Sequence, residues 1–101
     1  MTEFPRRGDI WTTDTGINVL VISSTVYNEI ASEPTVIGVP VFASEPDTGF
    51  GVQMGEGEWA APGLVASLRK ARLDQHRRRI EVQALTDVNN MLFKILTTPD
   101  R

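Results

Sequence analysis

A dense run of basic residues is the feature of this sequence best suited to chemistry. Six of the ten Lys and Arg residues lie between positions 69 and 79. They are Arg69, Lys70, Arg72, Arg77, Arg78 and Arg79. Such a density suits contacts with phosphates or other anions. The alternative is that several of them form ion pairs, within the fold or across a dimer, with Glu45, Asp47, Glu56 or Glu58. Three adjacent arginines cannot all face inward, so some cationic surface must remain.

Other residues that could do acid–base or metal chemistry are few. His76 is the only histidine; it can serve as a general acid or base, or lie on the surface beside the arginines. Glu56 and Glu58 alternate along one short segment, but the glycines around them are typical of a solvated turn. The chain has no cysteine, which excludes disulfides, thiolate zinc sites and a cysteine nucleophile. We therefore expect neither a metal nor a cofactor.

Length and charge distribution predict one soluble domain with an anionic partner. A chain of 101 residues fits a single domain over residues 1–101. The net charge is −7 over residues 1–67 and +4 over residues 68–101, which predicts a cationic surface on an acidic body. No apolar run approaches the roughly 20 residues of a membrane span, and the N-terminus lacks a signal-peptide core. We expect a cytoplasmic protein without a membrane partner.

The first half of the chain predicts closely spaced strands. Residues 9–14 and 17–22 read as a hairpin whose second strand is covered on both faces. Residues 23–30 predict a short helical turn, and residues 35–42 a third strand bent by its glycine and proline. A short strand at residues 50–54 and a turn at residues 55–58 lead into Trp59. Strands spaced in this way favour a small barrel.

The second half is ambiguous until the last segment. Residues 63–73 mix apolar and basic types, residues 74–79 predict an exposed connector, and residues 80–84 predict a strand. The apolar side chains that follow recur at helical spacing, at Val88, Met91, Leu92, Ile95 and Leu96. With Thr86 as N-cap and Pro99 beyond the end, this spacing predicts a terminal amphipathic helix.

Several segments in unbroken order resemble the MazF/PemK-like toxins of bacterial toxin–antitoxin pairs, which share a fold with the CcdB gyrase poisons. Arg7-Gly8-Asp9-Ile10-Trp11 resembles the family's opening strand, and Val19-Leu20-Val21-Ile22-Ser23 the second. Ile37-Gly38-Val39-Pro40-Val41 is similar to the third, Gly49-Phe50-Gly51-Val52-Gln53-Met54 to the next, and residues 63–70 to a hydrophobic, then polar, then basic stretch. The terminal helix agrees in place and pattern.

This resemblance implies a fold, partners and an activity. The fold is mainly β with α: a small, strongly bent antiparallel barrel of the SH3-like type, with a C-terminal amphipathic helix. The expected assembly is a homodimer, neutralised by an acidic antitoxin peptide that is disordered when free. The expected activity is that of an mRNA interferase, which cleaves single-stranded RNA without metal and uses the 2′-hydroxyl as nucleophile.

The chain departs from the family where that chemistry takes place. The family's arginine before the second strand corresponds here to Ile17, followed by Asn18 in place of proline, and its threonine after the third strand corresponds to Phe42. Isoleucine cannot stabilise a phosphorane, and phenylalanine has no hydroxyl. Substitutes near enough in sequence are Thr12, Asp14 and Ser44, with Arg69 as the cation.

The binding groove implied by the resemblance is cationic. Its candidate RNA- or antitoxin-binding residues are Lys70, Arg72, His76, Arg77, Arg78 and Arg79. Two alternatives stay open. One is a CcdB-like toxin that inhibits a protein target, although residues 97–101 lack the aromatic-glycine-aliphatic ending of the gyrase poisons. The other is a degenerate family member that serves only as a binding module.

Overall fold

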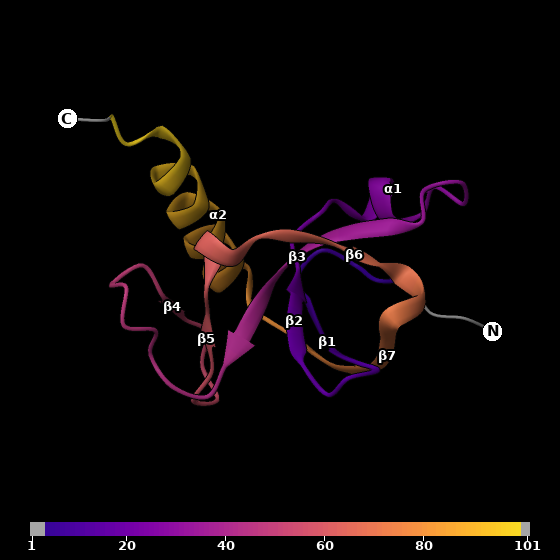
Figure 1. Cartoon of the computed structure of the whole chain (residues 1–101), viewed down its shortest axis with the longest axis horizontal. Helices are drawn as coiled ribbons and strands as arrows, with labels where there is room; N and C mark the ends of the chain where they lie inside the picture. The colour runs from indigo at the N-terminus through magenta and orange to yellow at the C-terminus, as the bar shows by residue number, and fades with distance from the viewer. Residues whose placement is uncertain (1–3, 100–101) are drawn as a thin grey trace.

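Within the residues that the structure describes, seven strands, all paired antiparallel, make up the sheet (Figure 1). The structure is a computed structural model that describes residues 4–99. The strands are β1 (Asp9–Thr13), β2 (Asn18–Val21), β3 (Thr35–Phe42), β4 (Val52–Gln53), β5 (Trp59–Ala60), β6 (Ala66–Arg69) and β7 (Leu73–Arg79). The helices are α1 (Thr25–Asn28) and α2 (Val82–Thr97), with single 3₁₀ turns η1 (Pro62–Leu64) and η2 (Lys70–Arg72). The strand order is β4-β5-β3-β2-β1-β7, and β6 pairs with β3.

Strand β3 joins two parts of the molecule because it changes partner along its length. Its first half pairs with β6 from Thr35 to Gly38, and its last residues pair with β5 at Val41 and Phe42. A side chain at Gly38 would lie 2.9 Å from the Leu20 carbonyl oxygen, so only glycine permits this approach of β2. The barrel of β1, β2, β3, β6 and β7 thus continues into the small β4–β5 sheet (Figure 1).

Two hydrophobic cores lie on opposite faces of the β1–β2 hairpin. Ile10 and Leu20 belong to a core that includes Val88 of α2, whereas Trp11 and Val19 belong to a second core within the barrel. Neighbouring residues enter different cores because successive side chains of a strand point to opposite faces. The hairpin is therefore covered on both sides, as its continuous apolar run predicts.

The terminal helix is confirmed, but it begins earlier than expected. Helix α2 starts at Val82, so the predicted strand at residues 80–84 and the predicted N-cap at Thr86 are both wrong; Glu81 occupies the cap position. The alternation of apolar residues was misleading because Ile80 is buried while Val82 is 80% exposed. Leu85 and Val88 instead share the helix face that packs on the first core.

The predicted connector at residues 74–79 is also wrong, because these residues belong to β7. This strand pairs with β1 along its length. Its polar composition is tolerated because two of its arginines are paired with carboxylates: Arg78 with Glu58 and Arg79 with Asp9. Tertiary contacts therefore override the low strand propensity of the segment.

The remaining expected elements are present, although the strand expected at residues 50–54 is limited to β4, Val52–Gln53. The hairpin forms as β1 and β2, the third strand covers residues 35–42 as predicted, and α1 is capped by the Ser24 hydroxyl, which accepts from the Tyr27 backbone N–H. Among the helices within residues 4–99, none has the length and apolarity needed to cross a bilayer.

Candidate functional site

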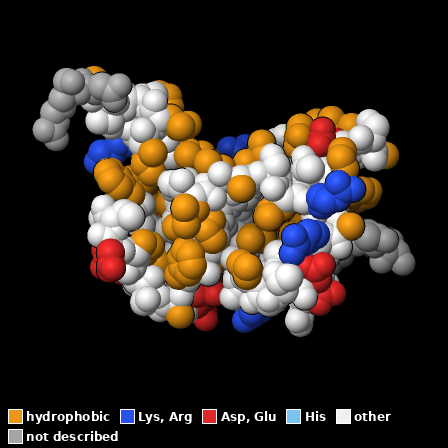
Figure 2. Space-filling view, viewed as in Figure 1, with side chains coloured by type: hydrophobic (Ala, Val, Ile, Leu, Met, Phe, Trp, Pro, Cys, Tyr) orange, Lys and Arg blue, Asp and Glu red, His pale blue; other side chains and the backbone are white. Residues whose placement is uncertain are grey.

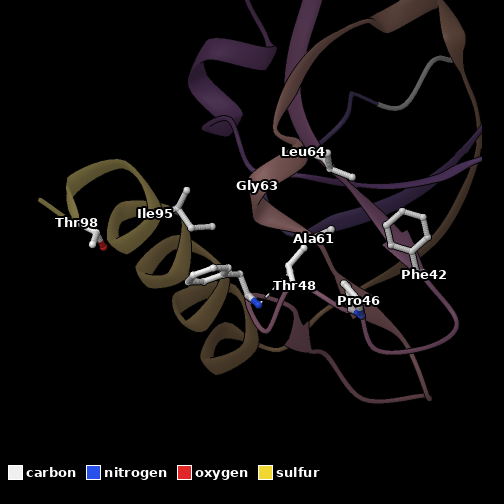
Figure 3. A pocket seen from close by; sticks show the side chains of 9 residues that line it. Phe42, Pro46, Thr48, Ala61, Gly63, Leu64, Ile95 and Thr98 are labelled. Atoms are coloured by element: carbon white, nitrogen blue, oxygen red, sulfur yellow. Dashed lines mark hydrogen bonds between the residues drawn. The ribbon is translucent and has the colours of Figure 1, made fainter. Parts of the chain in front are cut away.

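An apolar hollow runs across one face of the molecule, in two parts that share Leu64. The larger part, of about 440 Å³, is lined by Phe42, Pro46, Thr48, Phe50, Ala61, Gly63, Leu64, Ile95 and Thr98. Figure 3 shows Phe42 from β3, Leu64 from η1 and Ile95 from α2 around this space. The smaller part, of about 180 Å³, lies between β2, β3 and β6. Figure 2 shows hydrophobic side chains gathered across the middle of one face of the molecule, with basic side chains at several places around its margin.

Ile17 and Phe42, the two apolar residues expected at the family's catalytic positions, both line this hollow. Ile17 is 54% exposed and lines the smaller part, and Phe42 is 42% exposed and lines the larger. Neither side chain can donate or accept a hydrogen bond. At these two positions the face therefore offers apolar contacts, and neither residue can transfer a proton.

A polar cluster occupies the other face of the hairpin. The Thr12 hydroxyl donates to Asn18 Oδ1 at 2.7 Å, and Arg77 Nη1 lies 3.4 Å from both of these oxygens. Ile17 and Val19 line the apolar hollow, and Asn18 between them turns its amide to Thr12. The strand alternation that separates the two cores therefore also separates the polar cluster from Ile17.

A β-bulge in β7 accounts for the position of Arg77. Ile10 pairs with Arg78 and Trp11 pairs with His76, so Arg77 is the extra residue with no partner in β1. Bulges commonly redirect a side chain in this way. The guanidinium of Arg77 consequently reaches the ends of β1 and β2.

The tip of the hairpin carries an exposed ion pair. Arg72 Nε lies 3.2 Å from Asp14 Oδ1, and both side chains are about half exposed. An ion pair in this setting contributes about 0–1 kcal/mol to stability, because water screens it. Asp14 and Arg72 are thus adjacent and accessible.

Three further basic residues of β7 are engaged within the fold. Asp9, only 4% exposed, accepts from Arg79 Nε at 3.1 Å and lies 3.4 Å from His76 Nε2, whose ring also meets Trp11 edge-on. Arg78 donates to Glu58 Oε1 at 2.7 and 3.0 Å and to the Gly55 carbonyl oxygen at 3.3 Å. Arg78 therefore ties the β4–β5 turn to the barrel.

The last predicted site residues are spread along β3. Arg69 pairs with Thr35 at the start of that strand, and Ser44 follows its end. Eight strand residues span roughly 25 Å, so Arg69 and Ser44 are far apart within one chain. Lys70 donates from Nζ to the Ile30 carbonyl oxygen at 3.0 Å. The structure thus brings Thr12 next to Arg77 and Asp14 next to Arg72, but brings neither pair to Ser44 or Arg69.

Sequence reasoning missed Asn18 as a functional candidate and Asp9 as an ion-pair partner. The hairpin register, Thr12 opposite Asn18, contains the signal for the first. A turn centred on Thr15 places residues 12 and 18 opposite each other. Nothing in the sequence pairs Asp9 with Arg79, which is 70 positions away.

The combination of this fold and sequence defines a known class. Residues 6–96 match the model of the PemK-like, MazF-like toxins of type II toxin–antitoxin systems. The chain belongs to this family, as its motifs suggest. No curated protein matches the sequence.

Solved structures share the fold across the whole chain. An endoribonuclease from Mycobacterial species superposes with a TM-score of 0.83 at 18% identity, covering 100% of this chain and 99% of that one. An endoribonuclease from Mycobacterial species in complex with its cognate antitoxin gives 0.79 at 20%, covering 99% and 100%. MazE–MazF from Deinococcus radiodurans gives 0.81 at 19%, covering 94% and 98%. The predicted mainly β, MazF-like fold with a C-terminal helix is confirmed.

Proposed function

We propose that this protein is the toxin of a type II toxin–antitoxin pair, an endoribonuclease of single-stranded RNA that a cognate antitoxin neutralises. The observation that carries the proposal is the family match over residues 6–96, joined to a full-length likeness to an endoribonuclease. The exposed Arg69 and Arg77 are available to an anionic substrate. Action on RNA by such a toxin takes place in the cytoplasm.

The proposed reaction is metal-independent transesterification. A base removes the proton of the 2′-hydroxyl, the 2′-oxygen attacks phosphorus, and the bond to the 5′-oxygen breaks as an acid protonates it. The products are a 2′,3′-cyclic phosphate and a 5′-hydroxyl. Such a reaction needs a base, an acid and a cation for the phosphorane charge.

The proposed catalytic groups replace the family's usual pair. Ile17 and Phe42 stand at the positions of the family's arginine and threonine and cannot perform proton transfer. Asp14 is assigned as base and Thr12, whose hydroxyl donates to Asn18, as a residue that positions Arg77 for the phosphate, because both lie at the end of the hairpin with an arginine beside each. Ser44 and Arg69 enter the same site only if two copies contribute, since β3 separates them within one chain.

The proposed assembly is a homodimer formed through the apolar face. Phe42, Phe50 and Leu64 are large, exposed and adjacent to one hollow. A contiguous apolar surface of this kind is typical of a protein–protein interface. A two-fold contact there would bring the Ser44 end of one β3 towards the partner chain.

The proposed antitoxin is an acidic peptide that folds on binding. Basic side chains available to its carboxylates are Lys70, Arg72 and Arg77, each of which is at least partly exposed. In one solved relative, an endoribonuclease is complexed with its cognate antitoxin. His76, Arg78 and Arg79 contribute less in this proposal, because the carboxylate near each is buried or nearly so, whereas the Asp14 partner of Arg72 is half exposed.

The purified chain tests the proposal directly. Long single-stranded RNA is incubated with it in the presence of EDTA, and the new 5′ ends are mapped and tested for a 5′-hydroxyl. We expect site-selective cuts, and loss of cutting when the cognate antitoxin is added.

Intact RNA at high protein concentration would contradict the endoribonuclease assignment. Growth arrest without RNA cleavage would favour a protein target, the function that the apolar residues Ile17 and Phe42 suit best. If the chain causes neither growth arrest nor RNA cleavage, the remaining function is that of a binding module for a partner chain.

A further inference from the structure

We propose that Arg77 and the amide of Asn18 form a binding subsite for a backbone phosphate of single-stranded RNA. The subsite lies on the face of the β1–β2 hairpin opposite Ile17, outside the apolar hollow. It rests on the proposed action on RNA, and it names a contact that this action would use.

The charge of Arg77 is the first support. Its neighbours Arg78 and Arg79 are each held by a carboxylate, at 2.7 and 3.1 Å. Within residues 4–99, by contrast, no carboxylate oxygen lies within 4.0 Å of the Arg77 nitrogens. Two neutral oxygens hold Arg77 instead, on Thr12 and Asn18. These two long contacts, both of 3.4 Å and both from Nη1, orient the guanidinium without cancelling its charge, so the positive charge remains available to an anion.

The orientation of Asn18 is the second support. Its Oδ1 accepts from the Thr12 hydroxyl and from Arg77 Nη1, so its NH₂ group points away from both. Among the described residues, Asn18 Nδ2 donates to no protein acceptor. The oxygens of the cluster are therefore engaged within it, and the groups left without a protein partner among the described residues are N–H donors. Phosphate oxygens, which only accept, match this pattern.

The bulge at Arg77 is the third support. As the unpaired residue between two regular pairs of β1 and β7, Arg77 is directed to the hairpin end by the backbone itself. A donor set fixed before binding loses less conformational entropy when it takes a ligand. The subsite is thus organised in the free protein.

The repeating backbone of RNA makes phosphate the chosen occupant. Side chains of these types supply most of the positioning contacts to phosphates in nucleic-acid complexes. The hairpin tip is tight, with Gly16 N–H donating to the Thr13 carbonyl oxygen at 2.9 Å. A strand held at Asp14 and Thr12 therefore has its next phosphates close to Arg77, on the outer side of the hairpin.

The test measures binding apart from cleavage. A fluorescein-labelled 2′-O-methyl oligoribonucleotide has no free 2′-hydroxyl to attack, so its anisotropy reports affinity alone. Arg77→Gln is expected to weaken binding about tenfold and to flatten the slope of log affinity against log salt by about 0.7. Asn18→Asp is expected to act in the same direction, because a carboxylate there would pair with Arg77 and cancel its charge.

A matched control removes an exposed positive charge elsewhere. Arg7→Gln, close to α1, is expected to change the affinity by no more than about twofold, through long-range electrostatics alone. Thermal unfolding of each variant shows whether it is folded. Asn18→Asp also separates binding from structure: a merely structural Arg77 would keep its RNA affinity in that variant, since its ion pair would be stronger.

The outcomes separate this inference from the proposed function. If the wild type cleaves RNA, and both variants bind RNA with the affinity of the wild type, the subsite is overturned and the proposed function stands. A wild-type chain that binds no RNA overturns both. If Arg77→Gln keeps its affinity for RNA but no longer binds a synthetic Glu-rich peptide, Arg77 is assigned to an acidic peptide instead.

Discussion

The two faces of the β1–β2 hairpin differ in chemistry although they are built from the same few residues. One face presents Ile17 to an apolar hollow, and the other presents Thr12, Asn18 and Arg77. Ile17 and Asn18 are adjacent in sequence and serve different surfaces. The lesson is that neighbours in a strand belong to different sites, because their side chains alternate between faces.

The same lesson applies to the three adjacent arginines of β7. Arg78 is tied to Glu58 and Gly55, Arg79 is tied to Asp9, and Arg77 is held by neutral oxygens alone within the described residues. A basic run in sequence is therefore not one cationic patch. Two of the arginines are paired with carboxylates, and the third is the one that we propose binds phosphate.

The largest expected effect comes from placing a charge on the apolar face. Phe42→Asp should weaken homodimerisation by at least about 100-fold, because a carboxylate buried at an apolar contact without a partner is strongly unfavourable. Sedimentation velocity across a concentration series measures the shift from dimer to monomer.

Val26→Asp is the matched control for this prediction. Val26 is 77% exposed on α1, away from the hollow, so the same new charge should leave the dimer intact. A monomeric wild-type chain, or equal dimerisation of both variants, would contradict the proposed role of the apolar face.

A smaller effect should distinguish Arg78, which is paired with Glu58, from Arg77, which is proposed to bind phosphate. Arg78→Gln should lower the free energy of unfolding by about 2 kcal/mol, because it breaks charge-assisted hydrogen bonds to Glu58 and leaves that carboxylate without its partner. Arg77→Gln should lower it by less than about 0.5 kcal/mol, as is usual for a surface substitution. Urea denaturation measures both.

The double variant Arg78→Gln/Glu58→Gln provides the control for this pair. Removing both charges should cost less than the sum of the two single changes, because the two residues interact directly. Equal destabilisation by Arg77→Gln and Arg78→Gln would mean that the two arginines do not differ in role.

The smallest expected effect concerns pH and lies outside both faces. The Thr35 hydroxyl and backbone N–H donate to Glu33 Oε2 at 2.7 and 3.2 Å, and these bonds lower the pKa of Glu33 from its ordinary 4.5. A carboxyl with a lowered pKa stabilises the fold above its unfolded pKa, and this stabilisation disappears as the pH falls through the folded pKa. The wild type should therefore lose its advantage over Glu33→Gln between neutral pH and pH values below about 4.

Paired denaturation curves at several pH values measure that difference. Glu45→Gln, an exposed carboxylate after β3, is the reference for a general change in charge. A difference between wild type and Glu33→Gln that stays constant with pH would show that the Thr35 hydrogen bonds do not favour the ionised carboxyl.

Much of the fold could be predicted from local pattern. The apolar run of β2, the Ser24 cap of α1 and the 3.6-residue spacing of α2 act over a few residues, and each led to an element that the structure contains. The errors lay where distant partners decide. Residues 74–79 form a strand because they pair with β1 and because nearby carboxylates pair with their arginines. Residues 80–84 do not form the expected strand, because a helix that covers the first core begins within them.

The candidate site could be predicted only in its residue types. The sequence drew attention to Thr12, Asp14 and the basic run, and the structure does place an arginine beside each of the first two. The sequence could not show that Arg77 and Arg78 have different partners, because that difference depends on a bulge in β7. Nor could it show that Arg69 and Ser44 lie far apart, because that distance depends on the length of β3. A role for Asn18 could be inferred only once the register of the hairpin was known.

What the sequence determined by itself was the family, the order of most strands and the amphipathic terminal helix, since motif order, apolar periodicity and capping are properties of short segments. What only the tertiary structure decided was which cations are neutralised and which face each side chain occupies. Charge pairing between residues as far apart as Asp9 and Arg79 depends on strand register and burial, and neither is encoded within any one segment.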